Sequence, residues 1–190
     1  MKKHTLFPDD YIASVYDVDF EQLADEGYRG VIFDIDNTLV PHNAPADERA
    51  VDFFRYLKEN GFSTLLLSNN KEPRVKTFRD AVQATAYIYK AGKPKTAGYQ
   101  RAMEQMHTTE ETTLFVGDQI FTDIWGANRA GIRTIMVKPV LKWKEEIQII
   151  AKRFLEAMVL LVYRLYLATG GKTNKVPIKK GSKDENSSRK

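Results

Sequence analysis

Short apolar runs alternate with amphipathic stretches between residues 31 and 137, and this alternation constrains the fold more than any other feature. The runs typical of strands cover residues 31–36, 63–67, 86–89, 113–116 and 133–137. The stretches typical of helices cover residues 19–26, 46–60, 72–82, 94–106 and 120–130. Strands that alternate with helices of about ten residues favour right-handed crossovers between parallel strands. The sequence therefore predicts an α/β fold, with a parallel central sheet and helices on both faces.

Two carboxylates stand where the first apolar run ends. Asp34 and Asp36 follow Val31-Ile32-Phe33, and side chains two residues apart in a strand project to the same side. Open α/β sheets bind their ligands at the carboxyl ends of the strands. Two carboxylates held so near each other repel, so the pair requires a bound cation or a proton on one of its members. The structural alternative is an edge strand that runs into an Asp/Asn-rich turn.

Three later strand ends also finish in polar residues. Ser68 and Asn69 follow the second run, Lys93 follows the third, and Asp118 and Asp123 follow the fourth. Taken singly, these are a turn serine, a solvated lysine, a turn aspartate and a helix-surface aspartate. Their joint occurrence at the ends of successive strands favours a chemical site.

These clusters resemble the four motifs of the haloacid dehalogenase (HAD) superfamily of phosphohydrolases. The matching segments are Asp34-Ile35-Asp36-Asn37-Thr38, Leu67-Ser68-Asn69-Asn70, Lys93-Pro94 and Gly117-Asp118-Gln119-Ile120-Phe121-Thr122-Asp123. The resemblance covers roughly residues 28–138 and implies a Rossmann-like HAD fold. Any one motif is weak, whereas four in the right order are specific.

By this resemblance, Asp34 attacks phosphorus and forms an aspartyl-phosphate. Asp36 protonates the leaving alkoxide and then activates water. The implied cofactor is Mg²⁺, which prefers oxygen ligands. Its implied protein ligands are Asp34, the backbone carbonyl of Asp36, and Asp118.

The same resemblance gives the remaining site residues supporting roles. Ser68, Asn69 and Lys93 hold the phosphate oxygens of the substrate. Asp123 lies in the outer shell of the metal or orients Lys93. Thr38 holds the turn after Asp36.

HAD enzymes carry cap insertions at two places, and this chain has room for neither. Pro41 to Pro45 leads directly into the helix at Ala46, and residues 69–92 hold one helix and one short strand. We therefore expect no substantial cap domain and an open site. Such a site suits a large substrate that brings its own cover, such as a protein, a polymer end or a lipid headgroup.

Residues 141–168 are predicted to form one long amphipathic helix after a phosphatase domain at 1–140. Its apolar stripe comprises Ile147, Ile150, Phe154, Met158, Leu161 and Leu165, widened by Leu155, Val162 and Tyr166. Its polar side comprises Lys144, Glu145, Gln148, Lys152 and Glu156. The uncharged run 157–163 is too short to span a bilayer, so the pattern favours a helix that lies in a membrane interface. The alternative is a helix packed on the domain or in a dimer seam.

The basic character of the chain is confined to its end. Residues 169–190 carry a net charge of +5, against +4 for the whole chain, and their composition predicts a disordered tail. A polybasic tail beside an amphipathic helix suits an anionic membrane surface.

Composition narrows the setting further. The chain has no cysteine, which excludes disulfides and agrees with a reducing compartment. Its first residues lack the apolar core of a secretion signal. No nucleic-acid motif is visible. We therefore expect a cytoplasmic protein, peripheral on the inner face of the membrane.

At finer grain the chain is similar to the bacterial YqeG family of HAD subfamily IIIA, on residues 33–40, 117–128 and the amino-terminal Leu6-Phe7-Pro8-Asp9. That family is similar to mitochondrial and plastid phosphatidylglycerophosphate phosphatases. The resemblance implies a Mg²⁺-dependent phosphomonoesterase that makes phosphatidylglycerol at the membrane surface. The alternatives are a soluble phosphatase of nucleotides, sugar phosphates or phosphoproteins, and a non-catalytic binding or regulatory module on the same fold.

Overall fold

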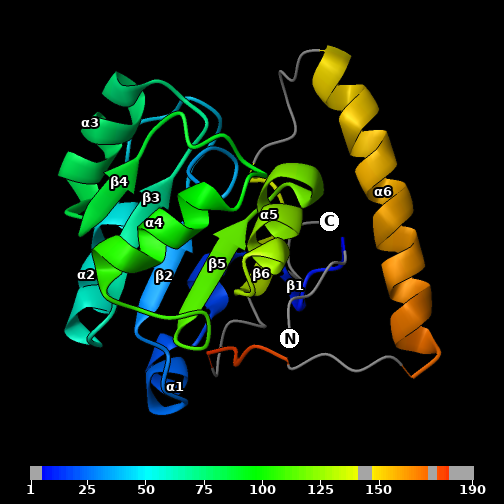
Figure 1. Ribbon diagram of the computed structural model, residues 1–190, viewed down its shortest axis with the longest axis horizontal. Helices are drawn as coiled ribbons and strands as arrows, with labels where there is room; N and C mark the ends of the chain where they lie inside the picture. The colour runs from blue at the N-terminus through cyan, green and yellow to red at the C-terminus, as the bar shows by residue number, and fades with distance from the viewer. Residues whose placement is uncertain (1–5, 141–146, 171–174, 180–190) are drawn as a thin grey trace, which may run out of the picture.

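A single parallel sheet of six strands organises the protein. The computed structural model describes residues 6–140, 147–170 and 175–179 (Figure 1). The strand order across the sheet is β1-β6-β5-β2-β3-β4, with every neighbouring pair parallel. The strands are β1 Asp10–Ile12, β2 Gly30–Phe33, β3 Ser63–Leu67, β4 Ala86–Ile88, β5 Thr113–Gly117 and β6 Arg133–Val137.

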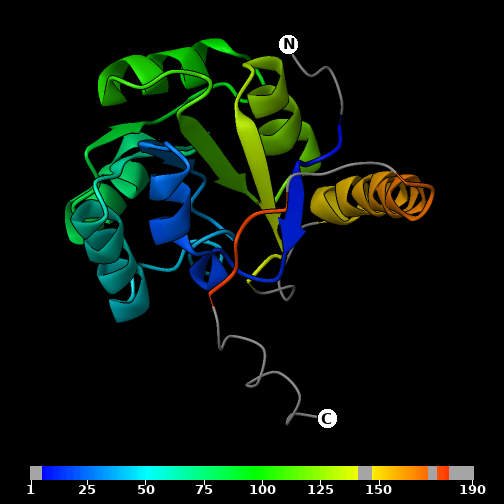
Figure 2. The ribbon, with the colours of Figure 1, turned by 90° about the horizontal axis from the view of Figure 1, so that it is seen from below.

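Helices cover both faces of this sheet (Figure 2). The helical elements are η1 Val15–Asp17, α1 Phe20–Asp25, α2 Glu48–Glu59, α3 Glu72–Val82, α4 Ala97–Met106, η2 Ile120–Ile124, α5 Trp125–Arg129 and α6 Ile147–Ala168. One core forms where α1, α2 and α3 meet one face of the sheet, and a second forms beneath α4 and α5 on the other. The apolar runs read from the sequence are these strands, buried on both faces as parallel strands are.

The predicted α/β architecture is confirmed, with local differences in several elements. The edge strand β1 was not predicted, since Asp10–Ile12 begins with a charged residue and contains no apolar run. The helix expected over 120–130 is divided into the π-helical turn η2 and the short helix α5. Asp123 lies within this π-helical turn, with its side chain against Gly117 at the end of β5.

The last helix, α6, lies beyond the β1 edge of the sheet and begins near the end of the molecule where the strands finish (Figure 1). The expected start at Leu141, the polar positions Lys144 and Glu145, and the side chains at 147–154 lie outside the described residues. Six large apolar side chains on this helix are 45–60% exposed, and we call them the α6 stripe. They are Leu155, Met158, Leu161, Val162, Leu165 and Tyr166.

One residue that was expected on the solvated side of this helix is buried instead. Glu156 is 3% exposed, and its Oε1 accepts a hydrogen bond from the backbone N–H of Ile120 at 2.9 Å. Tyr163 is also buried and contacts the ring of Phe7, with centroids 5.5 Å apart. Glu156, which was predicted to mark the polar side of the helix, therefore packs on the domain, in agreement with the alternative of a helix packed on the domain.

The described part of the tail also packs on the domain. The Val176 N–H donates to Asp10 Oδ1 at 2.7 Å, and Ile178 forms an antiparallel bridge with Val18. Lys179 lies over the Tyr56 ring at 4.1 Å. Residues 175–179 therefore differ from the disordered tail expected for 169–190, because four of them, Val176 to Lys179, have partners on the domain.

In the part of the chain that the structure describes, no helix combines the length and apolarity needed to cross a bilayer.

Candidate active site

The polar residues predicted from the sequence gather at one edge of the sheet. Strand β2 lies between β5 and β3, and β4 is next to β3, so the residues that follow these four strands meet at their shared carboxyl end. Seven of the eight predicted side chains are at most 8% exposed, and Asn69 is exposed. The seven are Asp34, Asp36, Thr38, Ser68, Lys93, Asp118 and Asp123. No inserted domain stands over this edge within residues 6–140.

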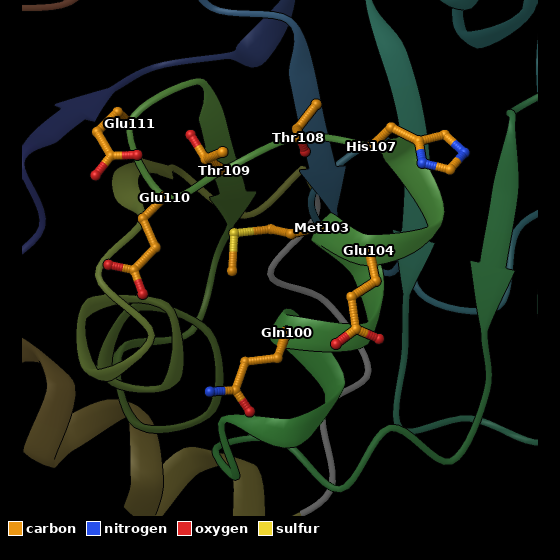
Figure 3. Close-up of a pocket in the computed structure, with 8 residues that line it drawn as sticks. All are labelled: Gln100, Met103, Glu104, His107, Thr108, Thr109, Glu110 and Glu111. Atoms are coloured by element: carbon orange, nitrogen blue, oxygen red, sulfur yellow. The ribbon is translucent and has the colours of Figure 1, made fainter.

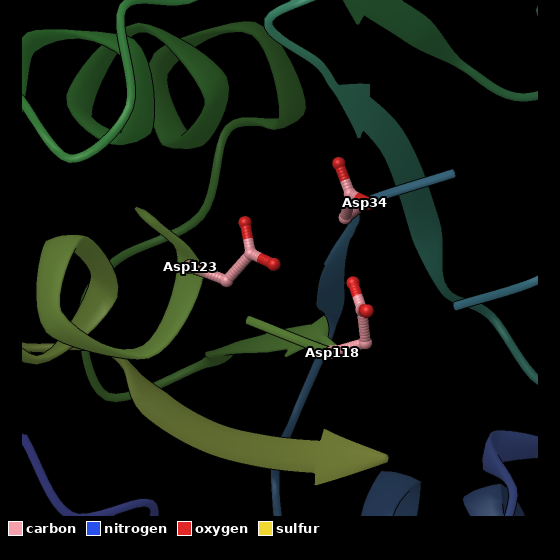
Figure 4. A group of neighbouring side chains, drawn as sticks. All are labelled: Asp34, Asp118 and Asp123. Carbon is pink, nitrogen blue, oxygen red and sulfur yellow. The ribbon is translucent and has the colours of Figure 1, made fainter. Parts of the chain in front are cut away.

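Three aspartates form a buried acidic cluster (Figure 4). Asp34 follows β2, Asp118 follows β5, and Asp123 comes from η2. One carboxylate oxygen from each lies within 4.8 Å of the other two. Three hard oxygen donors that can converge on one point are a donor set that Mg²⁺ accepts. The cluster differs from the expected ligand set by including the side chain of Asp123.

Gly117 makes this cluster possible. A Cβ atom at position 117 would lie 2.7 Å from both Cβ and Oδ2 of Asp123. Any larger residue at the end of β5 would therefore displace Asp123. The same carboxylate accepts the Gln119 N–H at 3.0 Å, which closes the turn between β5 and η2.

Lys93 enters the acidic cluster from the β4 side. Its Nζ lies 2.6 Å from Asp34 Oδ1 and 2.7 Å from Asp123 Oδ1. Although burial alone would lower it, the pKa of Lys93 is raised because Asp123 and Asp34 stabilise the ammonium form. Lys93 is thus a fixed positive charge inside the acidic cluster.

Asn69 holds the loop that carries Lys93. The Lys93 N–H donates to Asn69 Oδ1 at 2.9 Å, and Asn69 Nδ2 donates to the Lys93 carbonyl at 3.2 Å. The structure therefore places the Asn69 amide on the backbone of Lys93, where the sequence suggested a contact with the substrate phosphate. The sequence could not show this contact, because the two residues are 24 positions apart and meet only in the folded chain.

The pKa of Asp34 is raised to about 7. Burial is the largest cause, and the charges of Asp123 and Asp36 add to it, while Lys93 opposes them. A divalent cation beside Asp34 would act in the same direction as Lys93 and favour the carboxylate. The electrostatics of the cluster therefore suit a bound cation.

Asp36 has a different set of partners, on the α3 side of the site. Its Oδ1 accepts the Asn43 N–H at 2.7 Å and Arg74 Nη2 at 3.0 Å, and its Oδ2 accepts Asn70 Nδ2 at 2.5 Å. Sequence reasoning missed these three partners. Asn70 stands inside the second motif, but Asn43 and Arg74 carried no signal of their own.

The two hydroxyls of the site are both buried. Ser68 Oγ accepts the Asn70 N–H at 3.2 Å and keeps its own proton for donation. Thr38 Oγ1 has no hydrogen-bond partner among the described residues. The turn after Asp36 is formed by backbone bonds, since the N–H groups of Thr38 and Leu39 both donate to the carbonyl of Ile35.

Tyr99 of α4 supports the backbone that carries Asp123, and it was not identified from the sequence. Its hydroxyl donates to the carbonyls of Thr122 and Asp123 at 2.8 and 3.1 Å, and its ring packs edge-on against Phe115. Burial raises the pKa of its hydroxyl, so the donor stays protonated. A tyrosine on an apolar helix face reads as core, which is why the sequence gave no sign of this role.

A hollow of about 840 Å³ lies elsewhere, at the end of α4 and in the loop that enters β5 (Figure 3). Its lining is Gln100, Met103, Glu104, His107, Thr108, Thr109, Glu110 and Glu111. This region adjoins the amino-terminal end of the sheet, since Thr108 is 2.9 Å from a Cβ placed on Gly30 at the start of β2. None of the predicted site residues lines it.

Known proteins resemble this chain in the same region. The model of the haloacid dehalogenase-like hydrolase family matches residues 41–131. "Probable phosphatase YqeG" of Bacillus subtilis (strain 168) is 38% identical over 141 residues, which cover 74% of this chain and 81% of that protein. The chain belongs to the HAD family. It is therefore a HAD-type phosphatase, with its predicted site residues at the carboxyl edge of a HAD-like sheet.

Two more distant likenesses add detail about fold and relatives. "Phosphatidylglycerophosphate phosphatase 1, chloroplastic/mitochondrial" of Arabidopsis thaliana is 28% identical over 160 residues, covering 75% of this chain and 44% of that protein. A Legionella pneumophila protein assigned to HAD subfamily III A has a TM-score of 0.50 at 14% identity, covering 65% of this chain and 72% of that one. The structural likeness concerns the fold alone.

Proposed function

We propose that this HAD phosphatase is a Mg²⁺-dependent phosphomonoesterase that works through an aspartyl-phosphate and acts on phosphatidylglycerophosphate at a membrane surface. The observation that carries the chemical part is the buried cluster of Asp34, Asp118 and Asp123 with Lys93 inside it. The lipid substrate is supported by the likeness to the Arabidopsis phosphatidylglycerophosphate phosphatase and by the α6 stripe.

In the proposed mechanism, a carboxylate oxygen of Asp34 attacks phosphorus while the bond to the leaving alkoxide breaks. Asp36 gives the alkoxide its proton and later takes one from the water that hydrolyses the aspartyl-phosphate. Lys93 and the Ser68 hydroxyl hold phosphate oxygens and offset their negative charge.

The cation would be held by Asp34 and Asp118, with the backbone carbonyl of Asp36 and the Asp123 carboxylate as further oxygen donors. When bound, Mg²⁺ neutralises charge between the attacking carboxylate and the anionic phosphate. Asp123 has a second role in this scheme, because it also fixes the position of the Lys93 ammonium at 2.7 Å.

The membrane part of the proposal rests on the shape and polarity of α6. The opposite face of this helix is fixed to the domain through Glu156 and Tyr163, which leaves the α6 stripe exposed except where the Tyr166 ring also contacts Phe7. Single exposed apolar residues are ordinary, but six along one face of a helix favour contact with an apolar surface. The polybasic tail provides the matching charge for anionic headgroups.

The experiment is phosphate release from phosphatidylglycerophosphate in mixed micelles, with Mg²⁺ or with EDTA. We expect turnover by the wild type only with Mg²⁺, and none by Asp34→Asn. Fast hydrolysis of a soluble ester with no turnover of the lipid would remove the lipid substrate and leave the phosphatase chemistry standing. Equal activity in EDTA and in Mg²⁺ would show that the reaction does not require the metal.

A further inference from the structure

Arg74 lies beside the proposed proton donor but has no part in the chemistry described so far. It stands in the first turns of α3, and its Nη2 is 3.0 Å from Asp36 Oδ1. Its side chain is 19% exposed, so it reaches both the buried site and solvent. An arginine in this place can orient Asp36, or it can bind a group of the substrate.

The hydrogen bonds of Arg74 favour the second role. A guanidinium carries five N–H donors in one plane. The Nε of Arg74 is buried and has no hydrogen-bond partner among the described residues. A buried donor without an acceptor costs free energy, and an incoming anion that turns the guanidinium towards itself would remove that cost.

Asp36 is held without Arg74. Asn70 Nδ2 occupies its Oδ2, and the Asn43 N–H lies closer to its Oδ1, at 2.7 Å, than Arg74 does. Two donors therefore remain on Asp36 if Arg74 moves. Loss of the arginine from Asp36 would leave the carboxylate oriented.

The rim next to Arg74 is basic. Lys71 and Lys90 are both exposed, and the Lys90 N–H donates to the Asn70 carbonyl at 2.9 Å. The nearby acid Glu72 is engaged by the Tyr87 hydroxyl at 3.1 Å. The rim beside Asp36 thus carries one arginine and two lysines against one glutamate, which leaves it net positive.

From this arrangement we infer that Arg74 binds a second anionic group of the substrate, a phosphodiester attached to the alcohol that carries the scissile phosphate. The inference rests on the proposed function, because it assumes that the monoester phosphate occupies the cluster at Lys93. The leaving alcohol then lies towards Asp36, which must protonate it, and any group attached to that alcohol extends towards Arg74. A planar guanidinium can hold two oxygens of a phosphodiester at once.

The test compares two soluble substrates, so that membrane binding plays no part. One is glycerol phosphate, and the other is glycerol phosphate joined through a phosphodiester to a second glycerol. For the wild type we expect a kcat/KM roughly 10- to 100-fold higher for the compound with the diester. In Arg74→Gln this ratio should fall to about one, even if both activities drop because Asp36 has lost a partner.

Two matched variants distinguish a contact of Arg74 with the phosphodiester from a role of Arg74 in orienting Asp36. Asn70→Ala also removes a donor from Asp36, and it should lower both activities and leave their ratio unchanged. Arg79 lies on the same helix and also has a buried Nε without a hydrogen-bond partner among the described residues, but it bonds Asp80 and the Thr85 carbonyl instead of Asp36. Arg79→Gln should therefore leave the ratio unchanged as well. A ratio in Arg74→Gln equal to that of the wild type, or a wild-type ratio near one, would overturn the inference.

A binding measurement keeps the result independent of turnover. By calorimetry, Asp34→Asn should bind the diester compound more tightly than glycerol phosphate, and Asp34→Asn combined with Arg74→Gln should bind both alike. If the wild type hydrolyses neither soluble compound, the micelle assay still decides the proposed function, and the binding comparison still decides the role of Arg74. Equal binding of the two compounds by Asp34→Asn would overturn it.

Discussion

Asp123 is the residue on which the geometry of the site depends most. One of its oxygens accepts from Lys93 and the other from the Gln119 N–H, while its Cβ approaches Gly117 closely. The carboxylate can therefore fix the lysine and face the other two aspartates only while position 117 lacks a side chain.

This dependence predicts the effect of Gly117→Ala. Because the added Cβ would lie 2.7 Å from Asp123, we expect a loss of about 1–3 kcal/mol in the free energy of unfolding and a strong loss of kcat. Gly27→Ala is a suitable comparison, since position 27 has φ +98° and open space around it. It should cost about 1–2 kcal/mol through its backbone conformation and leave kcat unchanged. Urea denaturation and steady-state kinetics measure both, and full activity in Gly117→Ala would contradict the account.

The raised pKa of Asp34 predicts a pH dependence of stability. The folded protein, with a pKa of about 7 against an ordinary 3.8, binds a proton at Asp34 more readily than the unfolded chain does. Without divalent metal, the stability of the wild type relative to Asp34→Asn should therefore fall as the pH rises from about 4 to about 7, by on the order of a few kcal/mol. Above pH 7 the difference should be constant.

Urea denaturation in EDTA across this pH range is the measurement. Adding Mg²⁺ at pH 7 should restore stability to the wild type, because the cation favours the carboxylate, and should affect Asp34→Asn much less. A stability difference that is flat with pH in EDTA would show that Asp34 is not destabilised by burial.

At the scale of elements, α6 has two faces with different roles. Glu156, Tyr163 and their neighbours Val159 and Leu160 fix one face to η2, β6 and the amino-terminal segment. The α6 stripe occupies the other face. A helix fixed in this way presents its exposed residues in a constant orientation relative to the catalytic edge.

This division predicts that membrane binding and stability can be separated. Leu161→Ser combined with Leu165→Ser should weaken binding to phosphatidylglycerol vesicles at least roughly tenfold, because two exposed leucines no longer enter the apolar phase. The free energy of unfolding should stay unchanged, since both side chains are about 60% exposed. Tyr89→Ser, at another exposed apolar position, should not affect vesicle binding.

Vesicle flotation and thermal denaturation are the two readouts. If the double variant binds vesicles as the wild type does, the stripe is not the membrane surface. If it changes the protein from a dimer to a monomer in sedimentation, the stripe is instead a seam between two copies.

The elements also show what the sequence could and could not predict. Strands β3 and β6 and helix α3 match their predicted ranges, because apolar runs and helical periodicity come from local sequence. The buried position of Glu156 was not predictable, since a charged residue in a helical pattern reads as solvated unless its partner is known. That partner, the Ile120 N–H, is 36 residues away.

At the scale of the whole molecule, the parallel sheet brings distant residues to one edge. Asp34, Lys93 and Asp123 are separated by 59 and 30 positions, yet the lysine lies within hydrogen-bond distance of both acids. The order of motifs predicted this gathering because parallel strands share one carboxyl edge. The motif order did not predict the partners of Asp36 or the role of Tyr99, because side-chain contacts between helices and loops produce no periodic pattern in the sequence.

The central claim is that Asp34 forms a covalent phosphoryl intermediate, and rapid-quench mass spectrometry tests it most directly. An aryl phosphate is the suitable substrate, because its leaving group needs no proton from Asp36 and the first step can proceed in Asp36→Asn. Hydrolysis of the intermediate should then be slow, because water activation is lost.

In Asp36→Asn with Mg²⁺ we therefore expect a phosphoryl group to accumulate on the peptide that contains Asp34, and to be absent from Asp34→Asn. Phosphate release by the wild type with no label on Asp34 in Asp36→Asn, or a label on a different residue, would contradict the account.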